Sequence, residues 1–247
     1  MSDWPQKFLH AYKELHHYDS ITAEQEGLSL DDAYDVQHRY VHLRDEAISG
    51  FKAALTAPQA QAVMGINVPI IGALFASGAF DAGEPIELDK NALLETEIGF
   101  RLSGDVQTPV TEADVLERVD VCLPMIEIAS PNLATKPNGL DLIATNAASY
   151  GYLAGPAANV DPAAIDSYDA CLVKGEETLL EGSSAEVLGG QRQALAFLIN
   201  EVLARGYTLT SGQILMTGSI GGMVPAQPGQ YEATFGDLGS ISFEIAD

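Results

Sequence analysis

Three glutamates lie inside apolar runs that have the pattern of β-strands. Glu95 and Glu97 belong to the segment 93–100, and Glu127 belongs to the segment 123–128. Because side chains alternate along a strand, Glu95 and Glu97 share one face, about 7 Å apart at a rise of ~3.3 Å per residue. A buried carboxylate is costly unless a partner balances its charge. These runs therefore favour a fold whose strands carry a charge-compensated acidic site.

The partner that best suits these carboxylates is a divalent cation. Neither run contains a lysine, and the next cation along the chain after the glutamate pair is Arg101. A set of oxygen ligands without His or Cys is typical of Mg²⁺ or Mn²⁺ rather than zinc. The alternative is that Glu95 and Glu97 line the solvated face of an edge strand. The isolated position of Glu127 among Met and Ile fits that alternative poorly.

The charge balance argues against two classes of partner. The chain of 247 residues carries 35 acidic and 12 basic residues, a formal net charge of −23, so nucleic acid and anionic membrane surfaces are repelled. No window approaches 18 uninterrupted apolar residues. We expect a soluble, cytoplasmic protein with no nucleic-acid or membrane partner. The length and a hydrophobic content of 47% fit one domain, with an N-terminal helical arm at 1–50 and a β-rich catalytic core at 51–247.

The arm is predicted to hold two helices. The first covers 4–17, with Trp4, Phe8, Tyr12 and Leu15 at helical spacing. The second begins after a capping box formed by Ser29 and Asp32 and is predicted to end at Gly50.

All five histidines of the chain lie in this arm. His38 and His42 are four residues apart and could share a helical face that binds a metal. A surface or packing role is favoured for both, because no third ligand is near them in the sequence.

The segment after residue 50 has short apolar runs broken by turn residues, which indicates a β-rich body. The segment 170–178 is predicted to be a hairpin. The segment 191–205 is the exception, because it has one apolar stripe and predicts a long helix that Gly206 ends. Strands are predicted at 213–218 and 239–245, on either side of a loop rich in Pro and Gly.

Two further segments have weaker indications of chemistry. Lys52 is a lone cation among small and apolar residues, where burial would lower its pKa and suit it to proton transfer or to holding an anion. The local sequence favours a surface lysine instead. The Gly-rich segment 217–222 could offer backbone N–H groups to a substrate carboxylate, and a flexible turn explains it equally well.

A series of motifs extends over nearly the whole chain. They are 32–37, 50–52 with Leu55 and Thr56, 69–74, the pair Glu95 and Glu97, 124–127, 146–148, Gly218 with Ser219, 224–226 and 239–242. No single motif is decisive. In this order, they resemble the 2-keto-4-pentenoate hydratase and 4-oxalocrotonate decarboxylase family, which lies within the fumarylacetoacetate hydrolase superfamily.

The resemblance implies an α+β fold with a distorted β-barrel or mixed-sheet core and flanking helices. It also implies that Glu95, Glu97 and Glu127 are the metal ligands and that Lys52 is the active-site lysine. Leu55, Asn146 and Ser219 match positions expected to contact substrate. The implied cofactor is Mg²⁺ or Mn²⁺, and the implied substrate is a small 2-oxo acid or its dienol. Homo-oligomers are expected, as is assembly with a related pathway enzyme.

The chain also departs from the family pattern. Ile70 stands where the family commonly has an acidic residue, and Gly221, Gly222 and Gln227 stand where basic or polar groups are usual. Losing a positioned acid or base typically costs ~10²–10⁴-fold in rate. These losses favour a hydratase-like lyase acting on a monocarboxylate with a neutral tail. The alternatives are a decarboxylase or keto–enol isomerase on the same scaffold, or a catalytically degenerate partner subunit.

Overall fold

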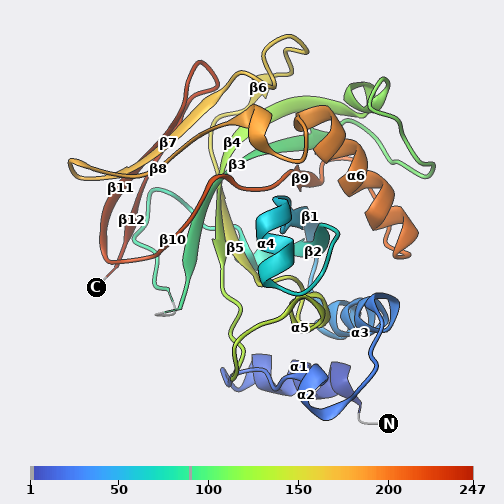
Figure 1. Ribbon diagram of the computed structural model, residues 1–247. Helices are drawn as coiled ribbons and strands as arrows, with labels where there is room; N and C mark the ends of the chain where they lie inside the picture. The colour runs from blue at the N-terminus through green and yellow to red at the C-terminus, as the bar shows by residue number, and fades with distance from the viewer. Residues whose placement is uncertain (1–2, 89–90, 247) are drawn as a thin grey trace.

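The computed structural model describes residues 3–88 and 91–246, which form a curled eight-stranded sheet, a smaller four-stranded sheet and helices packed outside them (Figure 1). The helices are α1 (Trp4–Lys13), α2 (Ile21–Glu24), α3 (Leu30–Leu43), α4 (Pro58–Val63), α5 (Gly139–Ala144) and α6 (Gln191–Ala204), with 3₁₀ turns η1 (Ala76–Gly78), η2 (Val115–Arg118) and η3 (Ser184–Glu186). The strands are β1 (Ile48–Ala54), β2 (Ile70–Phe75), β3 (Leu93–Leu102), β4 (Val119–Ala129), β5 (Ser149–Ala154), β6 (Ala158–Asn159), β7 (Asp169–Lys174), β8 (Glu177–Ser183), β9 (Ile214–Met216), β10 (Ile220–Pro225), β11 (Gly229–Phe235) and β12 (Ser240–Ile245).

The strand order of the large sheet brings the acidic strands next to β1. The order is β2-β1-β9-β3-β4-β5, with β10 also paired to β3 and β6 to β4, and only β1 and β9 run parallel. The register of β3 on β4 sets Glu95 directly opposite Glu127. Lys52 pairs with Met216 of β9, and Met216 pairs with Gly99 of β3 on its other side. The short strand β9 therefore lies between β1, which holds Lys52, and β3, which holds Glu95 and Glu97.

The large sheet curls until its last strand meets its first. The Ser149 hydroxyl at the start of β5 donates to the Ala73 carbonyl of β2 at 2.9 Å. The Phe80 N–H, just beyond β2, donates to the Tyr152 carbonyl of β5 at 2.9 Å. These contacts join the two ends of the strand order across the opening. The predicted α+β fold with a distorted, barrel-like core is confirmed.

Helix α3 protects the exposed edge of β2. The buried Gln37 amide donates to the carbonyls of Ile71 at 2.8 Å and Ile143 at 3.0 Å, and the Ile71 N–H donates to the Tyr34 hydroxyl at 3.0 Å. An uncovered strand edge leaves backbone groups unpaired and promotes aggregation. The arm is thus part of the packing of the core. Its predicted capping box is present, because Ser29 and Asp32 exchange the expected hydrogen bonds.

Several predicted boundaries are wrong. Helix α1 ends at Lys13, and Leu15 lies outside it with a left-handed backbone and an 89% exposed side chain. Helix α3 ends at Leu43, where Asp45 adopts a φ of +54°. Strand β1 begins at Ile48, so Gly50, where the second helix was predicted to end, lies inside a strand.

The second half of the chain agrees better with prediction. Strands β7 and β8 form the predicted hairpin, and α6 occupies the predicted helix with its apolar stripe buried. Gly206 follows α6 with a φ of +80°, as a helix-ending glycine does. The expected loop between β9 and β12 instead contains β10 and β11. Two glycines obscure the strand pattern of β10, whereas β11 alternates buried and exposed residues as a strand does. Among the described residues, no helix is long and apolar enough to cross a membrane.

Arg44 connects the arm to the core. Its guanidinium carbon lies 3.9 Å from the ring centre of Tyr12 in α1 and 3.7 Å from that of Phe75 in β2. The guanidinium also forms an ion pair with Glu46 at 2.9 Å, and its side chain is 8% exposed. A desolvated cation stacked on two rings contributes more than a surface pair does.

We expect Arg44→Ala to lower the free energy of unfolding by roughly 2–3 kcal/mol, because it removes two cation–ring contacts and leaves Glu46 without its ion-pair partner. The measurement is urea denaturation. Arg39→Ala, in the helix that ends just before Arg44, is the control, since its ion pair with Asp3 is exposed and should contribute less than about 0.5 kcal/mol. Equal losses in both variants would contradict the role given to Arg44.

Candidate metal and substrate site

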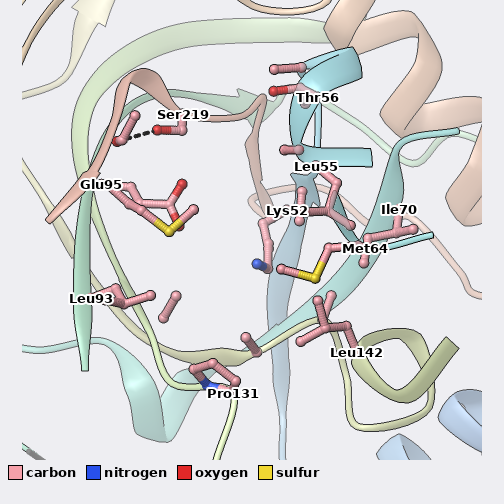
Figure 2. A pocket seen from close by; sticks show the side chains of 18 of the residues that line it. Lys52, Leu55, Thr56, Met64, Ile70, Leu93, Glu95, Pro131, Leu142 and Ser219 are labelled. Carbon is pink, nitrogen blue, oxygen red and sulfur yellow. Dashed lines mark hydrogen bonds between the residues drawn. The ribbon is translucent and has the colours of Figure 1, made fainter. Parts of the chain in front are cut away.

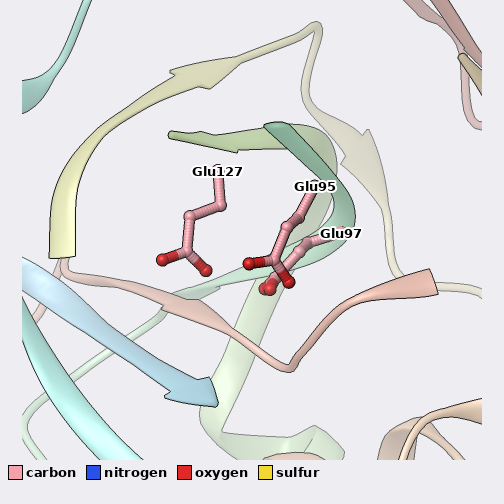
Figure 3. A group of neighbouring side chains, drawn as sticks. All are labelled: Glu95, Glu97 and Glu127. Atoms are coloured by element: carbon pink, nitrogen blue, oxygen red, sulfur yellow. The ribbon is translucent and has the colours of Figure 1, made fainter. Parts of the chain in front are cut away.

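The three predicted glutamates converge on one point (Figure 3). Glu95 and Glu97 project from the same face of β3, and Glu127 projects from the neighbouring strand β4. One carboxylate oxygen from each residue lies within 4.8 Å of the others. Glu97 and Glu127 are fully buried, whereas Glu95 is partly exposed and lines a cavity. The hypothesis of a solvated edge-strand face is wrong.

Lys52 supplies the cation that the neighbouring sequence lacked. Its side chain is 2% exposed, and its Nζ lies 2.7 Å from Glu127 Oε1, close enough for an ion pair but not aligned as a hydrogen bond. The local interpretation of Lys52 as a surface lysine is therefore wrong. The pairing depends on the β1-β9-β3-β4 strand order, which no local pattern reveals.

The residues present fit a divalent cation. Three carboxylates beside one ammonium leave two formal negative charges, which a divalent ion would neutralise. Glu97 Oε1 is buried without a hydrogen-bond donor, whereas Glu127 Oε1 faces the Lys52 ammonium. A buried oxygen without a donor needs a partner, and an all-oxygen donor set suits Mg²⁺ or Mn²⁺.

The two arm histidines do not form a comparable site. Among the described residues, the glutamate cluster is the only group of three or more metal-ligating side chains close enough to share an ion. The rings of His38 and His42 lie 4.2 Å apart, and both contact the ring of Tyr207. This arrangement supports the packing role.

Burial and mutual repulsion dominate the electrostatics of the site. Burial raises the pKa of Glu95 to about 7; Glu127 adds to the rise, while Lys52 and the Ser219 hydroxyl oppose it. Burial and the charges of Glu127 and Glu95 raise the pKa of Glu97 well above its usual range. Burial lowers the pKa of Lys52, but the surrounding carboxylates outweigh it and the net pKa is raised. Lys52 is therefore held as an ammonium ion.

The glycine segment before β10 orients one of the glutamates. The Gly218 N–H donates to Glu97 Oε2 at 2.9 Å. Gly218 has a φ of +123°, and a Cβ there would lie 2.6 Å from Thr56 Cγ2, so only glycine fits. The Thr217 hydroxyl, which donates to Gln191 Oε1 at 2.6 Å, fixes the segment from behind. The predicted offer of backbone N–H groups to substrate is replaced, at Gly218, by a contact with Glu97.

A cavity of about 290 Å³ begins at the glutamates and extends past Lys52 (Figure 2). Glu95 and Ser219 lie on one side of it, and Met64, Ile70 and Leu142 lie on the other. Most of its lining is apolar. The polar side chains in the lining are Lys52, Thr56, Glu95, Glu186 and Ser219.

Two of the three predicted substrate-binding residues line this cavity. Leu55 and Ser219 are part of its wall, and the Ser219 hydroxyl donates to the Gly222 carbonyl at 2.6 Å. Asn146 is not part of the wall. Its Oδ1 accepts from the Ala73 N–H at 2.7 Å and its Nδ2 donates to the Ala73 carbonyl at 2.9 Å, which leaves the amide engaged with β2. Direct contact between this amide and substrate stays a prediction that the geometry does not favour.

Asn146 instead holds a strained part of the cavity wall. It is the first of three consecutive left-handed residues, with φ values of +68°, +52° and +58° for Asn146, Ala147 and Ala148. Such a backbone costs roughly 1–2 kcal/mol per residue for L-amino acids other than Gly, and Asn tolerates it best. Ala147 and Ala148 line the cavity. The Asn146 amide therefore fixes the wall against β2.

Sequence reasoning missed several residues of the cavity wall. Met64 follows α4, Leu142 lies in the short helix α5, Pro131 lies beyond β4, and Glu186 ends η3. None stands in a motif with chemical meaning. Only the departure at Ile70, which faces the same cavity, indicated that this region is apolar.

Comparison with known proteins agrees with this geometry. No protein-family model matches the chain. The chain is 30% identical over 228 residues to the 2-keto-4-pentenoate hydratase of Paraburkholderia xenovorans (strain LB400), covering 88% of this chain and 84% of that protein. A solved structure of 4-oxalocrotonate decarboxylase from Pseudomonas putida G7, complexed with magnesium and adipate, has a TM-score of 0.89 at 26% identity and covers 98% of this chain and 95% of that chain.

A more distant structure shows the wider class. A fumarylacetoacetate hydrolase family protein from Yersinia pestis CO92 has a TM-score of 0.59 at 13% identity, over 81% of this chain and 94% of that chain, which supports the fold alone. The curled sheet is thus a fold shared with a fumarylacetoacetate hydrolase family protein. The chain belongs to the family of 2-keto-4-pentenoate hydratases and 4-oxalocrotonate decarboxylases.

We expect Asn146→Ala to lower the free energy of unfolding by roughly 2–4 kcal/mol, because it leaves the buried Ala73 N–H unpaired, leaves the Ala73 carbonyl with Ser149 as its donor, and puts Ala in a left-handed conformation. Thermal and urea denaturation measure the loss. Asn132→Ala is the matched control, since Asn132 also has a positive φ, of +43°, but makes exposed hydrogen bonds to the arm. A loss no larger than that of the control would show that Asn146 does not hold the wall.

The raised pKa of Glu95 predicts a pH-dependent stability in EDTA. A carboxyl whose folded pKa is about 7 binds its proton more tightly than the unfolded chain does. The resulting stability is present below its usual pKa and is lost as pH rises through 7. We expect the free energy of unfolding of Glu95→Gln to exceed that of the wild type by less than about 1 kcal/mol at pH 5 and by up to about 3 kcal/mol at pH 8.

Urea denaturation at the two pH values measures this difference. Glu186→Gln is the control, because Glu186 is an exposed glutamate of the same cavity. If the free energy of unfolding of the wild type at pH 8 equals or exceeds that of Glu95→Gln, the electrostatic description of the site is contradicted.

Proposed function

We propose that this protein is a divalent-metal-dependent lyase of hydratase type that acts on a 2-oxo acid or its dienol. The observation that carries the proposal is the convergence of Glu95, Glu97 and Glu127 beside the buried Lys52, next to a cavity that Glu95 and Lys52 line. The two relatives are named as a hydratase and a decarboxylase, and both names describe lyases of small 2-oxo acids.

The three glutamates would hold Mg²⁺ or Mn²⁺, which supplies a Lewis acid that favours charge on the oxygens of a 2-oxo acid. Lys52 is the protein group placed to contact the substrate at this end of the cavity. Its ammonium can donate a proton or hold the carboxylate, since it is buried and charged. Leu55 and Ser219, on the cavity wall, would orient the substrate.

The charges of the cavity support a monocarboxylate substrate. Lys52 is the only cation among the described lining residues, and it already faces Glu127. A second substrate carboxylate would be buried without a partner. The decarboxylase structure holds adipate, a dicarboxylate. Loss of CO₂ from the far end requires such a second carboxylate, so an uncharged tail favours hydration over decarboxylation here.

Keto–enol isomerisation shares the proton transfer at the head of the substrate, and product analysis separates it from hydration. Homo-oligomer formation, assembly with a related pathway enzyme and a cytoplasmic location belong to the same proposal. They rest on the family resemblance and on composition.

We expect the protein to consume a 2-hydroxy-2,4-dienoate with an uncharged tail. The loss of the dienol absorbance over time measures this turnover. EDTA should abolish turnover, and Mn²⁺ should restore it. Lys52→Met should lower kcat/KM by at least ~10²-fold, because it removes the only cation beside the reacting atoms. Mn²⁺ affinity in that variant should be equal or higher, since the glutamates lose a competing positive charge.

Two variants control this experiment. Glu97→Gln should weaken Mn²⁺ binding and turnover together, whereas Lys7→Met, at a surface ion pair, should change neither. Wild-type turnover by Lys52→Met would remove the lysine from the chemistry. Absence of Mn²⁺ binding at millimolar concentration by calorimetry would end the metal proposal.

A further inference from the structure

The cavity continues beyond the part that a small 2-oxo acid would need, and its far wall is apolar. We propose that this far half is a subsite for a bulky uncharged tail, about the size of a phenyl ring, on a 2-oxo acid substrate. The inference rests on the proposed function, because the metal-binding end fixes which part of the substrate lies where.

The arrangement of the side chains gives the tail a direction. The glutamates and Lys52 hold the charged head at one end. Across the cavity from Glu95, on the side where Lys52 also lies, Met64, Ile70 and Leu142 form the opposite wall (Figure 2). A substrate whose head lies between the glutamates and Lys52 would therefore extend its remaining atoms along this wall.

The volume of the cavity exceeds that of a small head group. A cavity of about 150 Å³ lined by aliphatic and aromatic side chains can hold benzene, and liquid water occupies ~30 Å³ per molecule. The cavity here measures about 290 Å³. It therefore has room for a carboxylate and an oxo group together with a ring or a branched alkyl chain.

The chemistry of the far wall rejects charge. Its residues are Met64, Ile70 and Leu142, which are all apolar. Ile70 is fully buried in β2, and Met64 is unbranched and adapts to irregular shapes. The remaining charged residue in the lining outside the metal end is the acidic Glu186, which would repel a second carboxylate.

Calorimetry on the Mn²⁺-loaded protein tests the subsite without requiring turnover. The probes are pyruvate, 2-oxo-4-phenylbutanoate and 2-oxoadipate, which share the same head and differ in the tail. We expect the phenyl compound to bind at least about tenfold more tightly than pyruvate, because it buries its ring on the far wall. We expect 2-oxoadipate to bind no more tightly than pyruvate.

Variants locate the gain on the far wall. Ile70→Asp and Met64→Gln should each reduce the ratio of the pyruvate Kd to the Kd of the phenyl compound at least about fivefold. Met64→Gln adds no buried charge, so it keeps the test decisive if Ile70→Asp does not fold. Val63→Asp is the control, since Val63 is a neighbouring residue whose side chain is 67% exposed and outside the cavity lining.

The outcomes separate this inference from the proposed function. If pyruvate binds and the phenyl compound binds no better, or if the far-wall variants leave its advantage intact, the tail subsite is overturned and the metal-dependent lyase stands. If Mn²⁺ binds but no 2-oxo acid does, the proposed function fails and the subsite fails with it.

Discussion

The structure depends on an unbalanced buried charge. Three carboxylates and one ammonium share a space in which their oxygens lie within 4.8 Å of one another. At an effective dielectric constant of ~20, two like charges 4 Å apart repel by about 4 kcal/mol, which is comparable to a large part of a domain's stability. The protein keeps the group together because β3 and β4 are long, buried and held in register around it. Such a site gains stability when a divalent cation enters it.

The rest of the fold keeps these strands in place. Helix α3 completes the hydrogen bonding of the β2 edge through Tyr34 and Gln37, and the Asn146 amide ties the turn before β5 to the same strand. Both devices act on β2, the neighbour of the strand that carries Lys52. The arm and the strained turn are far apart in the sequence. Together they close the curled sheet around the lysine and the glutamates.

Local patterns predicted the elements and the acidic cluster well. Strand alternation indicated that Glu95 and Glu97 share a face, and capping chemistry located the start of α3. The position of Lys52 could not be predicted in the same way, because its pairing with Glu127 depends on strands that meet only in the folded sheet. The resemblance to a family supplied that residue when its neighbours argued against it.

The errors have a similar physical origin. Asn146 matched a family motif, but a motif does not say whether an amide faces a ligand or a backbone strand. Strand β10 was missed because Gly221 and Gly222, both with positive φ, interrupt its alternation. Strand β11 does alternate, but the Pro and Gly content of the surrounding segment led to its prediction as a loop. Met64 and Leu142 have meaning only through the cavity that they share.

The loss of an acid at Ile70 changes more than one property of the site. An acid there would add a proton donor at the far end and would require polar surroundings or a counter-charge. Ile70 is buried in its place, and the charged residues of the cavity lining are Lys52 and Glu95, at the metal site, and Glu186. Proton transfer by protein groups is then confined to substrate atoms that Lys52 can reach. Under the proposed function, an apolar residue at this position would limit the acid–base chemistry and leave that side of the cavity free of charge, so one position would bear on both the reaction type and the substrate range.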